Sequence, residues 1–145
     1  MGNRHPSIAP YQVFDTADRP ITVAVGNDKQ FGAFCGAIGL PELAADPRFA
    51  TNPQRGANRD ALCALLEPAL KAAGADHWYQ RLTAVGVPAG PINDVAEAFA
   101  FARSLGMEAV VTVPGGTAPQ VANPVSMSAT PVSYRSGPPR LGSGD

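Results

Sequence analysis

Proline and glycine are unevenly distributed along this chain, and their positions constrain its fold more than any other feature. The 145 residues include 15 Gly and 15 Pro, which concentrate at residues 1–10, 86–91, 114–124 and 131–144. Proline fixes φ and removes a backbone donor, and glycine favours tight turns. We therefore expect turns and extended backbone at both ends of the chain, with helices in the middle.

Two short segments near the amino terminus have the composition of β-strands. Residues 11–15 and 20–26 are rich in β-branched and aromatic side chains, which strands favour. The intervening run Asp15-Thr16-Ala17-Asp18 holds the short polar residues that turns prefer. The sequence therefore predicts a β-hairpin.

The middle of the chain shows the spacing of amphipathic helices. The first helix is predicted to begin after Asn27, with Gln30 completing a capping box, and to end at Gly39. A longer helix is predicted over residues 58–72, and Pro68 should kink or split it because proline lacks a backbone N–H group. The apolar stripe expected on the first helix is Phe31, Phe34, Cys35 and Ile38.

Two more helices are predicted in the second half of the chain. Asp76 should cap the first of them, which ends at Gly86, and Asp94 with Glu97 should open the second through a capping box. A loop with stiff prolines, residues 87–91, is expected to separate these two helices.

A second hairpin and a proline-rich tail complete the predicted fold. Residues 107–113 and 120–128 predict two strands, joined by a turn at Pro114-Gly115-Gly116. Strands at both ends with helices between them predict an α+β fold, in which the two hairpins meet in a single small antiparallel sheet. The expected organisation is a linker loop (1–10), a small α+β domain (11–128) and an extended carboxy-terminal tail (129–145).

The charge pattern excludes several classes of protein. The formal net charge is −1 with both signs interspersed, whereas a nucleic-acid-binding protein should show a basic stripe. The longest apolar run falls far short of the roughly 20 residues that a membrane span needs. The first residues have the composition of a loop and not of a targeting signal. We therefore expect a soluble, cytoplasmic protein without a nucleic-acid or membrane partner.

Few residues offer metal or nucleophilic chemistry. Histidines occur only at His5 and His77, too few for a zinc site, and we expect no metal and no tightly bound cofactor. Cys35 and Cys63 are isolated and predict buried thiols in a reducing compartment, with a disulfide or a reactive thiol as the alternative. Cys63 with His77 is the one candidate pair for a thiol hydrolase, although Cys63 occupies an apolar helix position.

The amino-terminal loop, residues 2–10, combines polar side chains with a stiff backbone. Pro6 and Pro10 restrict a segment that carries His5 and Ser7. Such a segment is suited to holding hydrogen-bonding groups against a ligand, so His5 and Ser7 are candidate substrate-binding residues. An ordinary linker between domains is the alternative interpretation.

An ordered series of short motifs runs from residue 2 to residue 142. Its segments are Gly2-Asn3 with His5 to Phe14, then Ile21 to Asp28 with Gln30-Phe31, Asp46 to Asn52, Asn58-Arg59, Gly86 to Asn93, Asn123-Pro124, Ser128, Thr130-Pro131, and Pro138 to Gly142. Together they resemble the carboxy-terminal segment of CoA-transferase family III, the carnitine dehydratase/bile-acid-inducible protein F (CaiB/BaiF) type.

The resemblance implies the fold and activity of a longer protein. A Rossmann-like large domain would precede this segment, the tail would return to that domain, and two subunits would interlock as a homodimer. The reaction would move CoA from an acyl-CoA thioester to a carboxylic acid, and the small domain would shape the acyl pocket. The catalytic aspartate would lie in the missing amino-terminal large domain, so the resemblance assigns no catalytic residue here, and the segment alone should be inactive.

The resemblance also limits what can be transferred to the amino-terminal loop. In formyl-CoA transferases a mobile run of glycines stands where this chain has His5-Pro6-Ser7-Ile8, so only a substrate-facing position is carried over. Ordering an extended segment costs about 1–2 kcal/mol per residue. We therefore expect residues 1–10 and 130–145 to order only against the missing domain. The alternatives are a stand-alone α+β binding module and part of a 2-methylacyl-CoA racemase of the same family.

Overall fold

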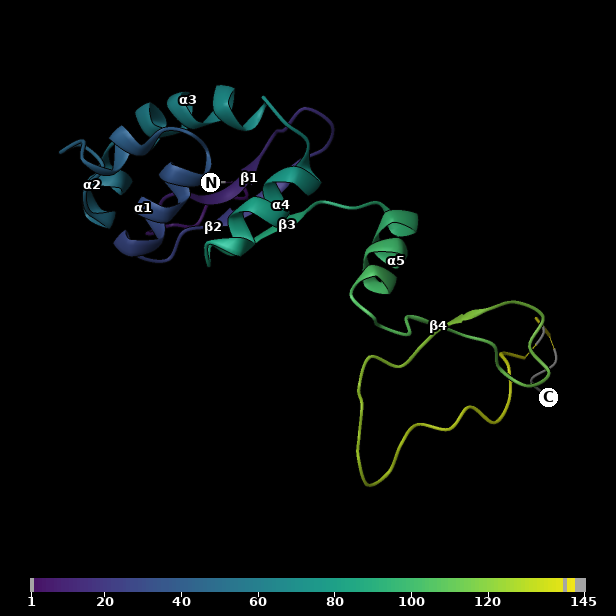
Figure 1. Cartoon of the computed structure of the whole chain (residues 1–145). Helices are drawn as coiled ribbons and strands as arrows, with labels where there is room; N and C mark the ends of the chain where they lie inside the picture. The colour runs from purple at the N-terminus through teal and green to yellow at the C-terminus, as the bar shows by residue number, and fades with distance from the viewer. Residues whose placement is uncertain (1, 140, 143–145) are drawn as a thin grey trace. The chain divides into compact units, whose positions relative to one another are not determined.

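The protein divides into two compact units, Met1–Ile92 and Asn93–Asp145 (Figure 1). The computed structural model describes residues 2–139, 141 and 142. Parts of two predicted segments, residue 1 of the loop and residues 140 and 143–145 of the tail, lie outside the described residues. Within the described part of the chain, no helix has both the length and the apolar character needed to cross a membrane.

The first unit contains a three-stranded antiparallel sheet. Strands β1 (Tyr11–Phe14) and β2 (Ile21–Ala24) form the predicted hairpin, with Val13 opposite Thr22. A third strand, β3 (Ala89–Pro91), pairs with the other edge of β2. We expected a loop there because of its prolines. The prolines are tolerated because β3 is an edge strand, which needs donors on one side only.

The α+β class is confirmed, but the single sheet is wrong. Strands β4 (Val110–Val111) and β5 (Gln120–Val121) pair only with each other and form a separate two-stranded sheet in the second unit. The physical reason is that β2 already has neighbours on both edges, β1 and β3. Gly115, with φ +74°, provides the left-handed position in the turn between β4 and β5.

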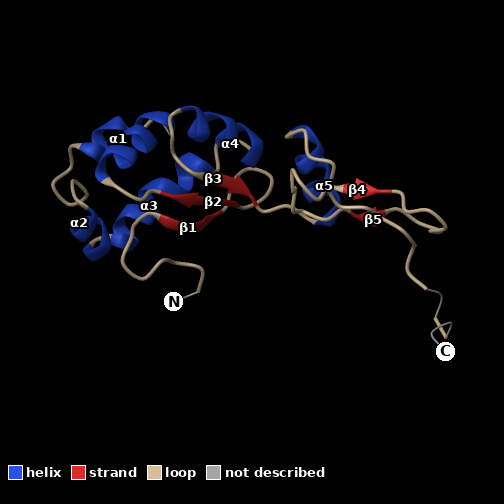
Figure 2. Cartoon of the chain, turned by 90° about the horizontal axis from the view of Figure 1, so that it is seen from below, coloured by secondary structure: helices blue, strands red, loops and turns tan. Residues whose placement is uncertain are grey.

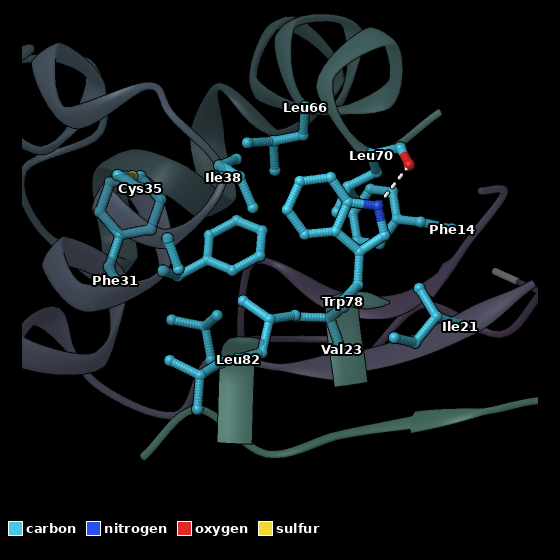
Figure 3. Close-up of a cluster of buried hydrophobic side chains, with 14 of the residues drawn as sticks. Phe14, Ile21, Val23, Phe31, Cys35, Ile38, Leu66, Leu70, Trp78 and Leu82 are labelled. Atoms are coloured by element: carbon cyan, nitrogen blue, oxygen red, sulfur yellow. Dashed lines mark hydrogen bonds between the residues drawn. The ribbon is translucent and has the colours of Figure 1, made fainter. Parts of the chain in front are cut away.

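The helices of the first unit cover the sheet and enclose one core. In Figure 2, α1 and α4 lie above the three strands, and apolar side chains from the sheet and from α1, α3 and α4 meet between them (Figure 3). The predicted stripe of the first helix, which includes Phe31 and Phe34, is buried there. The helical elements of this unit are α1 (Asp28–Ala37), the 3-10 helix η1 (Pro41–Ala44), α2 (Asn52–Ala57), α3 (Arg59–Leu70) and α4 (Ala75–Ala84).

Two helix predictions need correction. Helix α2 was missed, although Thr51 and Gln54 form a capping box at its start. Helix α3 is not split at Pro68, because the proline lies in its last turn and the helix ends at Leu70. There the missing N–H group removes one hydrogen bond near a terminus and does not interrupt the helix interior.

We expected Asp76 to cap helix α4, but the capping group comes from a distant turn. Its N-cap residue is Gly74, and the carboxylate of Asp18 accepts a hydrogen bond from the backbone N–H of Ala75 at 2.8 Å. A Cβ atom on Gly74 would come within 2.5 Å of Asp18 Oδ2, so glycine is required for this approach. The bond from Ala75, helped by the Thr16 hydroxyl and the Arg19 backbone, lowers the pKa of Asp18 from 3.8 to about 2.

Replacing Asp18 by asparagine should destabilise the protein in a pH-dependent way. Because the pKa of Asp18 is lower in the folded state, its carboxylate stabilises the fold above about pH 4, and this contribution is lost as the pH falls toward about 2. The difference in thermal unfolding midpoint between wild type and Asp18→Asn should therefore be largest at neutral pH. At low pH the two midpoints should become nearly equal. Asp15→Asn, in the same turn, is the control and should have little effect. An equal difference at both pH extremes would contradict this account.

The second unit has little core of its own. Helix α5 (Val95–Ser104) begins with the predicted capping box of Asp94 and Glu97, but none of its residues is buried. Val113 is the buried apolar residue among the described residues of this unit. As predicted, residues 131–139 form neither helix nor strand.

Candidate functional site

The amino-terminal loop is held in place by side chains of α2 and α3. The amide of Asn52 donates to the Ser7 carbonyl at 2.8 Å and accepts from the Ala9 N–H group at 3.1 Å. Arg59 donates to the carbonyls of His5 at 2.7 Å and Ile8 at 3.0 Å. The expectation that this loop would order only against a missing domain is therefore wrong for these residues, because its backbone groups find partners within the first unit.

The loop is also joined to the sheet and to the core. The His5 N–H group donates to the Tyr11 carbonyl, and the Val25 N–H group donates to the Pro10 carbonyl, each at 2.9 Å. Arg55, which is fully buried, donates through Nε to the Ala9 carbonyl at 2.7 Å. A segment with this many fixed carbonyls has the rigidity that a binding loop needs and that a flexible linker lacks.

The two predicted site residues lie at neighbouring points of this loop but have different surroundings. His5 is half-buried and stacks on the Tyr11 ring, with ring centroids 5.0 Å apart. Its Nδ1 atom accepts hydrogen bonds from the backbone N–H groups of Ser7 at 3.2 Å and Ile8 at 3.1 Å. Ser7 is exposed. The imidazole thus organises the turn that presents the Ser7 side chain.

A small basic hollow adjoins the loop. It has a volume of about 360 Å³ and is lined by Arg4, His5, Pro6 and Arg59. The Arg4 guanidinium contacts the Asp60 carboxylate at 2.8 Å, whereas the Arg59 fork is bonded to uncharged carbonyls. The lining therefore carries excess positive charge, which favours an anionic ligand such as a carboxylate.

Sequence reasoning missed the residues that hold the loop. Asn52 and Arg55 lie on α2 and Arg59 lies on α3, so these side chains come from two separate helices. No single helical pattern therefore marks them in the sequence.

The structure gives no support to thiol chemistry. Cys35 and Cys63 are both free and buried, and burial raises the pKa of each thiol, that of Cys35 to about 12. At neutral pH both thiols are therefore protonated, and the thiolate is the nucleophilic species. Among the described residues, no three His, Cys, Asp or Glu side chains gather where they could hold a metal ion.

The second unit contains a larger, mainly apolar hollow. Its volume is about 600 Å³, and it lies between the loop after α5, strand β5 and the tail. Met107, Val121, Val125 and Met127 line it and are exposed to solvent. Exposed apolar side chains concentrated in one region are typical of surfaces that contact another protein segment.

The fold is thus a small α+β unit with a rigid polar loop, joined in sequence to a unit with little core. The chain matches the family described as CoA-transferase family III over residues 1–144, and it belongs to that family. This confirms the resemblance carried by the motif series.

The relatives are substantially longer than this chain. It is 44% identical over 142 residues to an acetyl-CoA:oxalate CoA-transferase of Acetobacter aceti, covering 97% of this chain and 36% of that protein. It is 34% identical over 144 residues to a human succinyl-CoA:glutarate CoA-transferase, covering 97% of this chain and 33% of that protein. Among solved structures, a CAIB/BAIF family protein from Brucella suis superposes with a TM-score of 0.82 at 42% identity, over 97% of this chain and 36% of that one. The chain therefore spans about a third of the length of these relatives.

Proposed function

We propose that this chain is the carboxy-terminal part of an acyl-CoA transferase that moves CoA from an acyl-CoA thioester to a carboxylic acid. In this proposal the first unit shapes the acyl pocket and presents the amino-terminal loop to the substrate. The catalytic aspartate belongs to an amino-terminal large domain. The complete enzyme is a cytoplasmic homodimer with interlocked subunits. It uses the CoA thioester as a substrate and needs no tightly bound cofactor.

The observation that carries this proposal is family membership over nearly the whole chain, at about a third of the relatives' length. The names of the relatives favour a transferase over the racemase, because both are CoA-transferases. The second unit has a sparse core and exposes Val121, Val125 and Met127. Both features support the proposal that this unit packs against a further protein surface, which a stand-alone module would not need. Isolated thiols support a reducing compartment.

His5 and Ser7 are the proposed substrate-binding residues. The fixed loop and the basic hollow beside it support this role, because a carboxylate substrate needs rigid donors and positive charge. Neither residue is proposed as a nucleophile.

The purified 145-residue chain should have no transferase activity. Incubation with acetyl-CoA and oxalate, or with succinyl-CoA and glutarate, should yield no new thioester, and mass spectrometry should find no CoA adduct on the chain. The Acetobacter aceti relative serves as the positive control in the same assay. Turnover, or a CoA thioester on this chain, would show that the chain contains the catalytic residue and would overturn the proposal.

A chimera tests the positive half of the proposal. The segment of the Acetobacter aceti enzyme that matches this chain is replaced by residues 1–145, which are 44% identical to it over 142 residues. Transfer of CoA by the chimera supports the assigned role. If the chimera folds and has the same molecular mass in solution as the parent enzyme but transfers no CoA, the assigned role is contradicted.

A further inference from the structure

The hydrogen bonds of His5 determine which ring nitrogen can act on a ligand. Nδ1 accepts from two backbone N–H groups, those of Ser7 and Ile8. A nitrogen that accepts hydrogen bonds carries no proton, so the neutral imidazole has its proton on Nε2. The turn thus fixes one tautomer and leaves the Nε2–H group as a donor, with the ring orientation set by stacking on Tyr11.

Two side chains from the helices hold the geometry of this turn. Arg59 donates to the carbonyls at both ends of the His5–Ile8 segment, at 2.7 and 3.0 Å. The Asn52 amide donates to the Ser7 carbonyl, within this segment, and accepts from the Ala9 N–H group directly after it. The two N–H groups that meet His5 Nδ1 therefore lie within a backbone segment clamped from α2 and α3.

We propose that Arg59 and Asn52 are positioning residues that hold His5 as a fixed Nε2–H donor to a carboxylate oxygen of the acceptor acid. The ligand part of this inference rests on the proposed transferase function. The chemistry of the hollow selects the ligand class, because Arg4 and Arg59 line it together with His5. A carboxylate there accepts a hydrogen bond from the imidazole while the guanidinium groups supply positive charge.

The positioning role is tested on the 145-residue chain without any substrate. In Arg59→Met both donors to the loop carbonyls are lost, so amide hydrogen exchange at Ser7 and Ile8 should accelerate by about tenfold or more. Exchange at buried core amides, such as that of Phe34, should not change. Arg59→Lys can satisfy one carbonyl and should give an intermediate rate.

Arg48→Met is the matched control for this experiment. Arg48 is a partly exposed arginine of the same unit, and its guanidinium pairs with Asp46. The Arg48→Met substitution should leave amide hydrogen exchange at Ser7 and Ile8 unchanged. If Arg59→Met behaves like Arg48→Met, Arg59 does not position the turn and the inference fails, whatever the chain's activity.

The donor role is tested by two substitutions of His5 in the active chimera. Asparagine places an acceptor near the position of Nδ1 but has no group at Nε2, so His5→Asn should keep the turn and lose the donor. We expect the KM for the carboxylic acid to rise by about tenfold or more while the KM for the acyl-CoA stays unchanged. His5→Gln, which reaches the Nε2 position, should recover part of the loss.

The outcomes separate this inference from the proposed function. An active chimera in which His5→Asn leaves the KM for the acid unchanged overturns the donor role and leaves the transferase assignment standing. A folded but inactive chimera overturns the transferase assignment and the carboxylate ligand with it. The exchange experiment still decides the positioning role in that case.

Discussion

Replacing Arg55 by methionine should cost the first unit about 2–6 kcal/mol of folding free energy, because it leaves two buried carbonyls without a donor at about 1–3 kcal/mol each. The Arg55 side chain is fully buried and donates to the Ala9 carbonyl, to the Phe49 carbonyl at 3.0 Å and to Asp28 Oδ1 at 2.7 Å. Its guanidinium also lies 4.4 Å from the centre of the Phe31 ring. Methionine fills similar space but leaves two buried carbonyls without these donors.

The measurement is urea unfolding followed by circular dichroism, with two comparison variants. Arg55→Lys keeps the charge but cannot reach three acceptors in different directions, so it should recover only part of the loss. Arg48→Met removes a partly exposed arginine that pairs with Asp46 and should cost about 0–1 kcal/mol. Equal losses in Arg55→Met and Arg48→Met would mean that the buried contacts of Arg55 contribute no more than a surface pair.

Local patterns predicted several elements whose signals lie within a few neighbouring residues. The Asn27 cap of α1, the capping box of Asp94 and Glu97, and the hairpin of β1 and β2 are all present. Each depends on contacts between residues close in sequence, and the sequence shows both partners at once.

Long-range partners explain two of the wrong predictions. Asp76 is a residue type that often caps helices, but the start of α4 is bound by Asp18, which lies 57 positions before its partner Ala75. Strand β3 forms only because β2 offers a free edge, and nothing within residues 87–91 indicates that edge.

The same distinction between local signals and long-range contacts applies to the candidate site. Sequence alone singled out His5 and Ser7 as side chains on a stiff loop, and their substrate-binding role stays a prediction. Asn52 and Arg59 lie 43 and 51 positions from their partners in the loop, Ala9 and Ile8. Contacts at such separations depend on how the helices pack, so the residue pattern could not reveal them.

Trp78 joins the end of α3 to α4, and its removal should have the second large effect. Its indole N–H donates to the Leu70 carbonyl at 2.6 Å (Figure 3) and to the Ala73 carbonyl at 3.1 Å. Leu70 is the last residue of α3, and its carbonyl has no helical partner. Ala73 lies in the loop that follows, and its carbonyl also accepts from the Ala17 N–H group at 3.0 Å. The ring, 5% exposed, also packs in the core of the first unit.

Trp78→Ala should therefore lose about 3–5 kcal/mol through the cavity that it leaves, whereas Trp78→Phe should lose about 1–3 kcal/mol through the unpaired Leu70 carbonyl. The chain contains 1 Trp, so its fluorescence disappears in both variants, and unfolding is followed by circular dichroism. The control is His77→Ala, which changes the exposed neighbour that meets the Trp78 ring edge-on and should cost under about 0.5 kcal/mol. If Trp78→Phe were as stable as wild type, the indole hydrogen bonds would add nothing to packing, and the end of α3 would depend on apolar contacts alone.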